Sequence, residues 1–311
     1  MNSQIKRTIK RILVKMVKPP LKTCSNLLHR VIVMKDPDEG KRGTPTFNTT
    51  YAYLQYWHGR IVGEVHSEFG GVTVPGFQTA RPQYVWGVVW GAYLAKALGI
   101  KRISVMELGV AGGNGLVVLE VIAEKVKSYL GIDIDVYGFD SGAGSPKPTD
   151  YRDAPNLLQE GVYPMDAEKL KKRLRIAELL LGPIDRTIQS FIESKPAPVA
   201  FVAFDMLLYS ATIKALKLFE ADEKMLLPRI QCYFGACMGH THSDFTTDRA
   251  AISEFNDAHQ LRKISLCYGL DTQVEDSTTW AGRMFLAHIF DHSLYGANDG
   301  LITVRDNPLI V

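Results

Sequence analysis

Short apolar runs recur along the chain and alternate with longer stretches whose apolar residues have helical spacing. The clearest case is a run over 103–108, then a helical stretch over 116–130, then a second run over 136–140. Such runs are typical of strands buried on both faces of a parallel sheet, with helices as connections. The pattern predicts an α/β fold with a doubly wound, mostly parallel, seven-stranded Rossmann-like sheet. Further strands are predicted over 177–182, 198–204, 230–234, 263–267 and 301–304, the last two as an edge pair, and helices over 85–98, 186–193 and 213–220.

A glycine-rich turn joins the first predicted strand to its helix. The strand ends at Glu107 and Leu108, and the turn contains four glycines, among them Gly109 and Gly113. Without a Cβ the backbone can bend sharply and approach a ligand, and the helix that follows has free N–H groups at its N-terminus. The next strand ends in Asp140. Ligands bind outside the carboxyl ends of such strands, so the sequence predicts a nucleotide-like cofactor site there.

The residues around this turn discriminate between cofactors. A dinucleotide turn reads G-x-G-x-x-G, whereas this turn has an acid, Glu107, before its first glycine. A carboxylate there would repel a pyrophosphate, which disfavours a nicotinamide dehydrogenase, but it suits a ligand that carries an ammonium and a sulfonium. Asp140 is placed to accept hydrogen bonds from two ribose hydroxyls. An ordinary strand–turn–helix unit without a ligand is the alternative.

These segments resemble the class I S-adenosylmethionine (SAM) methyltransferases, and among them the macrocin O-methyltransferase-like group. The resemblance covers about residues 80–295 and is specific at 138–142, 150–153, 201–212 and 227–234. It implies a Rossmann-like methyltransferase domain with SAM as cofactor and O-methylation of a small or glycosylated acceptor. The residues that it implies for cofactor binding are Glu107, Gly109, Gly113, Asp140 and Ser141.

The chain departs from that group where a metal ion would bind. Metal-dependent members have a second aspartate in the fourth-strand motif, where this chain has Leu207, and an Asp-Asp pair where it has Gly235 and Ala236. The remaining acid, Asp205, cannot by itself supply the several oxygen ligands of a magnesium ion. We therefore expect no metal site of that kind and metal-independent activity.

A loop with two histidines follows the fifth predicted strand. His240 or His242 could replace the lost acids as general base, because the pKa of imidazole lies near neutral pH. The same histidines could instead bind a metal ion with Asp205, or zinc with Cys232 and Cys237, although that spacing is not a standard zinc pattern. The third interpretation is a solvated loop. We keep Asp205, His240 and His242 as candidate catalytic residues.

The charge is concentrated at the N-terminus. Residues 1–35 contain nine of the 36 Lys and Arg residues and no acid, so 27 basic residues face 33 acidic ones in the remainder. This asymmetry argues against nucleic acid as a partner of the main domain and predicts a basic arm over 1–35. Apolar residues within 5–18 fall on one helical face, which is typical of peripheral membrane contact. A helix that packs on its own domain or on a second copy of the chain, as in a homo-oligomer, is the alternative.

The remaining chain divides at about residue 85. Residues 36–85 are predicted to be a linker and a cap, in which an aromatic stretch over 51–57 either stacks on an acceptor or packs in the core. Residues 86–311 form the predicted SAM-binding domain. The four cysteines show no disulfide spacing, which favours the cytoplasm, at the inner face of the membrane if the arm binds lipid. His288 and His292 are predicted to lie four apart on a helix with structural roles.

The sequence thus favours a SAM-dependent, metal-independent O-methyltransferase of a small-molecule or glycan acceptor. The residues Leu207, Gly235 and Ala236 leave open a protein of another class. In that alternative, the chain keeps a methyltransferase fold without activity and serves as a binding or scaffold partner.

Overall fold

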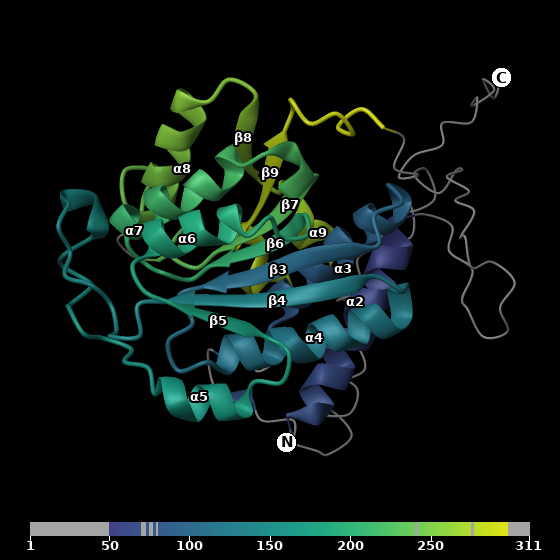
Figure 1. Cartoon of the computed structure of the whole chain (residues 1–311), viewed down its shortest axis with the longest axis horizontal. Coiled ribbons are helices and arrows are strands. Elements are labelled where there is room, and N and C mark those ends of the chain that lie inside the picture. The colour runs from purple at the N-terminus through teal and green to yellow at the C-terminus, as the bar shows by residue number, and fades with distance from the viewer. Residues whose placement is uncertain are drawn as a thin grey trace, which may run out of the picture. The chain divides into compact units, whose positions relative to one another are not determined.

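Seven strands form one sheet in the order β5-β4-β3-β6-β7-β9-β8 (Figure 1). The computed structural model describes residues 50–69, 73–74, 77–78, 80–239, 242–274 and 277–297. Strands β5 to β7 of this order run parallel, and β9 runs antiparallel to both of its neighbours. The predicted fold class is therefore confirmed. The strands are β3 (Arg102–Leu108), β4 (Asp133–Asp140), β5 (Glu178–Leu181), β6 (Val199–Phe204), β7 (Leu226–Phe234), β8 (Arg262–Leu266) and β9 (Met284–Ile289), with a separate short pair of β1 (Thr73–Val74) and β2 (Phe77–Gln78).

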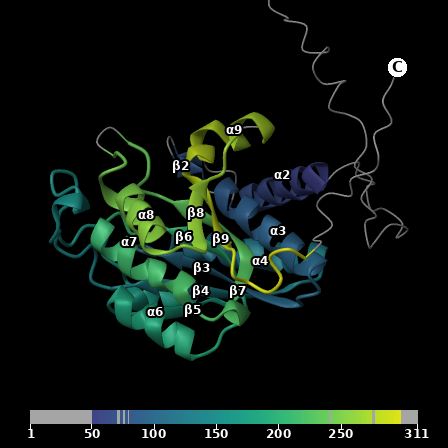
Figure 2. The ribbon, with the colours of Figure 1, turned by 90° about the horizontal axis from the view of Figure 1, so that it is seen from above.

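Helices cover both faces of the sheet. Figure 2 shows α2, α3 and α4 on one side, with α6, α7 and α8 on the other. Because both faces are covered, β6 is buried along its whole length, and β3 is buried except at its first residue. The helices are α2 (Thr50–Glu68), α3 (Pro82–Ala97), α4 (Asn114–Leu130), α5 (Ala167–Arg173), α6 (Ile184–Glu193), α7 (Tyr209–Ala215), α8 (Thr247–Ala258) and α9 (Leu270–Gln273), with 3-10 turns η1 (Tyr151–Asp153), η2 (Leu216–Glu220), η3 (Glu223–Met225), η4 (Ser277–Thr279) and η5 (Ala281–Arg283).

The aromatic stretch over 51–57 belongs to α2 and packs in the core. Trp57 is 7% exposed and stacks on Tyr129 of α4 with ring centroids 4.8 Å apart. Tyr53 packs against Tyr93 of α3 at 5.5 Å. Of the two interpretations of this stretch, core packing is the one that the structure describes. The buried residues of α2 are Leu54, Trp57, Ile61 and Val65, at helical spacing.

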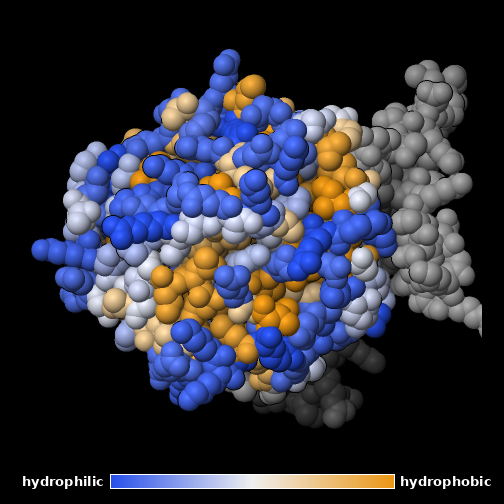
Figure 3. All heavy atoms as spheres, in the orientation of Figure 1, coloured by the Kyte–Doolittle hydropathy of each residue, from blue (hydrophilic) through white to orange (hydrophobic). Residues whose placement is uncertain are grey.

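One edge of the sheet stays open. Among the described strands, β5 pairs only with β4, and its residues are exposed or half-buried. Ile176 just before it and Leu181 at its end are 49% and 39% exposed. Figure 3 shows apolar surface on the face where this strand lies.

The C-terminal part of the sheet differs from the prediction. Residues 284–289 form the strand β9, so a helix with His288 and His292 is wrong: His288 lies in β9 and His292 in the turn after it. Strand β9 pairs with β8 and β7, which is the place that residues 301–304 were expected to take, and those residues lie outside the described part of the chain. Both histidines have structural partners, because His288 Nδ1 lies 2.8 Å from the Tyr295 hydroxyl and His292 Nε2 lies 3.1 Å from the Leu226 carbonyl oxygen.

The N-terminal arm over 1–35 also lies outside the described residues, and the boundaries predicted at 35 and 85 stay predictions. Within the part of the chain that is described, no helix combines the length and hydropathy needed to cross a bilayer.

Candidate active site

A cavity of about 450 Å³ opens at the carboxyl ends of β3 to β6. The chain crosses from β3 to β4 on one side and later returns to β6 on the other, so this is the switch point at which doubly wound sheets bind ligands. Four of the residues proposed from the sequence line it, namely Gly109, Asp140, Ser141 and Asp205. The sequence did not identify the segment after β5, which supplies Gly182, Pro183, Ile184 and Asp185.

The glycine turn is tightly confined at its first position. Gly109 has φ +90°, and a Cβ there would lie 2.5 Å from the carbonyl oxygen of Asp205. Any side chain would push β3 and β6 apart, so glycine is required where the turn passes under the cavity. Gly113 is the N-cap residue of α4. A Cβ on Gly113 would lie 2.2 Å from the Leu170 side chain of α5. It does not line the cavity.

The Asp140 carboxylate holds two segments of main chain, one in the glycine turn and one in the loop after β4. Its Oδ2 accepts a hydrogen bond from the Ala111 N–H at 2.9 Å, and its Oδ1 accepts one from the Gly142 N–H at 2.7 Å. Each carboxylate oxygen has a second lone pair, so both can still accept a ligand hydroxyl. Ser141 shapes the loop that follows, since its hydroxyl donates to the Gly144 carbonyl at 2.8 Å.

Glu107 lies behind the cavity wall and is 1% exposed. The Tyr84 hydroxyl donates to its Oε1 at 2.7 Å, and its Oε2 has no hydrogen-bond partner among the described residues. Burial raises the pKa of Glu107 to about 8, although the nearby Arg81 guanidinium and the Tyr84 hydroxyl oppose the shift. An unpartnered, buried carboxyl oxygen is costly, and a cationic group brought close to it would remove that cost.

Asp205 lines the cavity, and it forms an ion pair with Arg81, which is not among the lining residues. Arg81 Nη1 lies 3.8 Å from Asp205 Oδ2, and the Arg81 side chain is 12% exposed. Burial raises the pKa of Asp205, while Arg81 and then Arg283 lower it. A Cβ at Gly235 would lie 2.2 Å from Asp205 Oδ1. The carboxylate therefore occupies space that the side chain of an acid at position 235 would need.

The histidine loop is described only in part. His240 lies outside the described residues, and His242 does not line the cavity. His242 Nδ1 lies 3.0 Å from Thr247 Oγ1, and that hydroxyl donates its hydrogen to the Ala236 carbonyl at 2.6 Å. Nδ1 must then carry the ring hydrogen, which leaves the lone pair of neutral imidazole on Nε2. Burial, and next Arg283, lower the pKa of His242, so the ring favours its neutral, basic form.

The metal interpretations gain no support from the described residues, in which no three His, Cys, Asp or Glu side chains gather. Cys237 donates to the Phe234 carbonyl at 3.1 Å, and burial raises the pKa of its thiol to about 12. Burial also raises the pKa of Cys232.

Leu207 lines the cavity with φ +68°. This is a strained conformation for a branched side chain, and such strain is common at functional sites.

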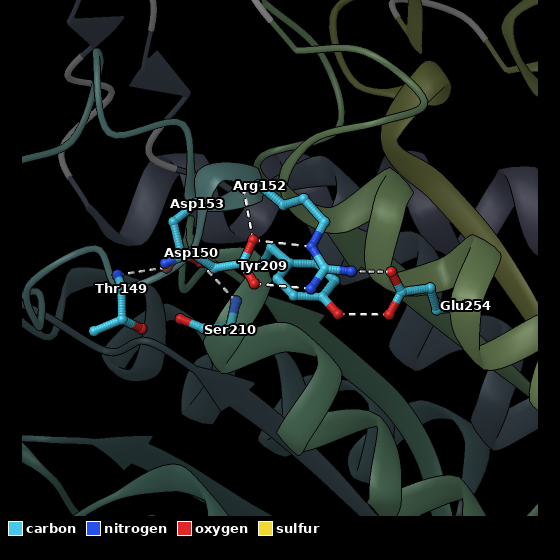
Figure 4. Close-up of polar contacts among 7 residues, drawn as sticks. All are labelled: Thr149, Asp150, Arg152, Asp153, Tyr209, Ser210 and Glu254. Atoms are coloured by element: carbon cyan, nitrogen blue, oxygen red, sulfur yellow. Dashed lines mark hydrogen bonds and ion pairs between the residues drawn. The ribbon is translucent and has the colours of Figure 1, made fainter.

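The wall opposite β6 is a long loop between β4 and α5. Its anchor is Asp153, which is fully buried. One carboxylate oxygen accepts from the N–H groups of Thr149 and Asp150, both at 3.0 Å, and the other accepts from the Ser210 N–H at 2.7 Å (Figure 4). Because Ser210 lies in the first turn of α7, Asp153 fastens the loop to that helix and also satisfies one of its free N–H groups.

A second layer of contacts supports the same loop. Arg152 makes two hydrogen bonds to Asp150, at 2.9 and 2.8 Å, and another to Glu254 of α8. Its guanidinium carbon lies 3.9 Å from the centroid of the Tyr209 ring. The Tyr209 hydroxyl donates to Glu254 at 2.5 Å. Figure 4 shows these side chains in one continuous network, which holds the cavity wall against α7 and α8.

A buried acid that the sequence did not identify lies beneath the histidine loop. Asp248 of α8 is fully buried and accepts hydrogen bonds from the Thr212 hydroxyl at 2.7 Å and the Ala236 N–H at 2.8 Å. Burial raises its pKa from 3.8 to about 7. Nothing in its sequence neighbourhood marks it, because the packing of α8 against α7 and β8 is what removes it from water.

We expect Asp248→Asn to remove part of the pH dependence of stability. Between pH 4 and 7 the folded protein holds a proton on Asp248 that the unfolded chain has released, so the free energy of unfolding falls as the pH rises. The loss amounts to about 4 kcal/mol in wild type. Urea denaturation at pH 5 and pH 8 should show a smaller fall for the variant, since Asn keeps an acceptor for the Ala236 N–H. An equal fall in both proteins would contradict the assignment.

Comparisons with known proteins add little. No family model matches this chain, and no curated protein matches it. Among solved structures, the calicheamicin methyltransferase CalS11 is 15% identical over 82% of this chain and 99% of its own, with a TM-score of 0.48. The O-methyltransferase NovP is 12% identical over 66% of this chain and 90% of its own, at 0.44. The O-methyltransferase TomG from Streptomyces achromogenes, solved with SAM, is 16% identical over 75% and 88%, at 0.36. Likeness at this level carries no argument about activity, which must come from the site.

Proposed function

We propose that this chain is a SAM-dependent methyltransferase that acts on an oxygen of a small or glycosylated acceptor without a metal ion. The observation that carries the proposal is the joint lining of one cavity by Gly109, Asp140 and Asp205 at the switch point of the sheet. Such a cofactor requires a turn whose main chain can approach it and an acid that accepts hydrogen bonds from its ribose. It also requires an acid near its methyl group.

The residues fit this cofactor by charge and by space. The turn at Gly109 has no side chain, so its main chain lines the cavity directly. The unpartnered oxygen of Glu107 favours a cationic amino-acid end over a diphosphate. Ile184, which is half-buried, offers apolar surface for an adenine ring in the same cavity as the ribose acceptor Asp140. When bound, SAM would supply an activated methyl group on a sulfonium.

The chain itself has to align the acceptor and take its proton. Methyl transfer is faster when the acceptor oxygen and the methyl group are held in line. The loop anchored by Asp153 gives the cavity a rigid wall that supports this alignment. For the proton we propose His242 as general base, with its basic Nε2 set by the Nδ1 contact to Thr247. His240 is the second candidate on the same loop, and Asp205 is the third.

Cofactor binding tests the proposal directly. We expect S-adenosylhomocysteine, the product form of the cofactor, to bind in the micromolar range, on the order of −8 kcal/mol. Asp140→Ala should weaken binding by about 1–3 kcal/mol, since the ribose hydroxyls lose their acceptor. Asp133→Ala, at the opposite end of the same strand, is the matched control and should bind like wild type. Titration calorimetry without heat for folded wild type would refute the cofactor assignment.

A scaffold without activity is the second candidate, and one observation favours it. Where the metal-dependent methyltransferases that the sequence resembles have acids, this chain has Leu207, Gly235 and Ala236. In addition, His242 does not line the cavity. The two functions differ in turnover: the enzyme converts SAM to S-adenosylhomocysteine when hydroxylated glycosides or phenols are supplied, and the scaffold binds without conversion.

We further propose that residues 5–18 bind the membrane surface from the cytoplasmic side, which the basic charge of the arm supports. Deleting residues 1–20 should reduce cosedimentation with anionic vesicles, while affinity for S-adenosylhomocysteine stays the same. High salt should weaken vesicle binding of the full chain. Equal vesicle binding by both forms would favour the packed helix or a homo-oligomer contact instead.

A further inference from the structure

Two lysines that cofactor binding does not account for line the cavity. Lys147 belongs to the loop between β4 and α5, and Lys214 belongs to α7. Both side chains are exposed, and neither ammonium group forms a hydrogen bond or an ion pair within the part of the chain that the structure describes. The cavity therefore offers two positive charges that are not paired with an acid of the described protein.

Two hydroxyl groups lie in the same lining. Thr149 follows Lys147 by two residues, and Ser210 precedes Lys214 by four, so that Ser210 and Lys214 lie on one face of α7. Neither hydroxyl has a hydrogen-bond partner among the described residues. An ammonium group has three N–H donors and a hydroxyl group has one. The two lysines and the two hydroxyls thus present several donors to one cavity.

A single buried carboxylate fastens both lysine-bearing segments. Asp153 accepts hydrogen bonds from the Thr149 N–H at 3.0 Å and from the Ser210 N–H at 2.7 Å (Figure 4). The loop that carries Lys147 and the helix that carries Lys214 are therefore held by the same side chain. Because the main chain beside each lysine is fixed, a ligand that contacts both ammonium groups has to order only their side chains, which limits the entropic cost of binding.

The acids in the cavity lining have positions or partners of their own. The Asp140 carboxylate holds two main-chain N–H groups, and Asp205 forms an ion pair with Arg81. Asp185 lies in the first turn of α6, where the helix dipole favours a carboxylate. No ion pair between described residues joins one of these acids to either lysine. An anionic ligand would thus bind the lysines without displacing an acid.

The kind of donor favours phosphate over carboxylate. A guanidinium group donates in a planar fork that matches a carboxylate, and no arginine is among the described residues that line the cavity. Lysine binds phosphate as a point charge. The oxygens of a phosphate group point in several directions, so they can accept from two ammonium groups and from hydroxyls of different segments.

Tyr163 adds a flat apolar surface to the same lining. Its side chain is 57% exposed, and its main chain has φ +61°, a strained conformation for a residue with a side chain. The preceding residue is held in place, because the Ser145 N–H donates to the Val162 carbonyl at 2.8 Å and the Ser145 hydroxyl accepts from the Val162 N–H at 3.1 Å. A phenol ring in this position can pack against a sugar or aromatic ring.

We propose that the acceptor carries a phosphate group, which Lys147 and Lys214 bind, on a sugar or aromatic ring that packs against Tyr163. This rests on the proposed function, since it names the class of acceptor for the same cavity. The phosphate is unchanged in the reaction. A hydroxyl oxygen of the acceptor forms a bond to the methyl carbon, the bond from that carbon to sulfur breaks, and the hydroxyl proton goes to the base.

The test measures binding to protein saturated with S-adenosylhomocysteine, by phosphorus NMR or calorimetry. The probes are inorganic phosphate, acetate, glucose 1-phosphate and phenyl phosphate. Inorganic phosphate should bind about 10-fold more tightly than acetate, and at least one of the two esters should bind more tightly than inorganic phosphate. Lys147→Gln and Lys214→Gln should each weaken binding of the phosphate probes about 10-fold, because each loses a charge-assisted hydrogen bond. Lys217→Gln removes the same charge three positions further along the chain, outside the lining, and is the matched control. Tyr163→Ala should remove the advantage of the ester over the free ion.

Affinity for S-adenosylhomocysteine is measured separately and should be the same in all three lysine variants. If wild type binds S-adenosylhomocysteine but prefers acetate or binds no phosphate, or if Lys147→Gln and Lys214→Gln bind phosphate like Lys217→Gln, the phosphate assignment is wrong and the proposed function still stands. Equal affinity for inorganic phosphate and both esters would mean a site for the free ion and would contradict a phosphorylated acceptor. If folded wild type does not bind S-adenosylhomocysteine, the proposed function fails and the acceptor assignment fails with it.

Discussion

Replacing His242 with alanine is expected to lower methyl transfer by about 10²- to 10⁴-fold, the usual contribution of a general base. The affinity for S-adenosylhomocysteine should stay close to that of wild type, because the imidazole is proposed to act on the acceptor. In wild type the rate should rise with pH and level off above the pKa of His242, since only the neutral ring accepts a proton. Burial and Arg283 lower that pKa, so the midpoint should lie below 6.5. Product formation from labelled SAM with hydroxylated glycosides or phenols measures both effects.

His240→Ala is the paired variant on the same loop. If it loses activity and His242→Ala does not, the base is His240. If both variants keep full activity, Asp205 becomes the candidate, and Asp205→Asn should then abolish transfer.

The rate of methyl transfer should be the same in EDTA and with added magnesium. A rate that disappears in EDTA and returns with magnesium would show that a metal site exists after all, and an absence of any methylated acceptor would favour the scaffold.

Asp153→Ala should be the most destabilising single change in the wall of the cavity. Three partly buried N–H groups, those of Thr149, Asp150 and Ser210, would lose their acceptor at once. We expect a loss of about 4 kcal/mol in the free energy of unfolding, or about 10 °C in melting temperature for a domain of this size. Cofactor affinity should fall as well, because the loop that Asp153 anchors lines the cavity.

Asp150→Ala is the matched control, since it removes the same side chain three positions earlier. Asp150 pairs with Arg152 near the surface, where an ion pair contributes little to stability. Thermal unfolding should therefore place Asp150→Ala near wild type and Asp153→Ala well below it. Similar melting temperatures for the two variants would mean that the loop is not held by Asp153.

The sequence alone determined the central part of the sheet. Strands buried on both faces are continuous apolar runs, so β3, β4 and β6 were predicted within a few residues of their observed bounds. The turn at Gly109 and the acid Asp140 were also identified, because parallel strands all present their carboxyl ends at one edge. These features are local: each follows from residues that are close together in the chain.

The inner strand β9 was not predicted, whereas the edge strands β5 and β8 were. Residues 284–289 are a short, mostly apolar segment, and a segment of this kind fits either a strand or a helix. Pairing with β7 and β8 decided the outcome, and those partners lie far away in the chain. The same reason explains why His288 and His292 were placed on a helix.

Tertiary structure alone decided which charged groups meet at the site. Arg81 and Asp205 are separated by more than a hundred residues, and they meet because α3 lies against β6 and β7 on the sheet. Burial of Asp248 and Glu107, and with it the pKa of each, likewise depends on helices packed from elsewhere in the chain. Periodicity reports which face of an element is buried, but contact between distant side chains follows only from how the elements pack. The strands, the glycine turn and the position of Asp140 were therefore predictable, whereas the ion pair between Arg81 and Asp205 was not.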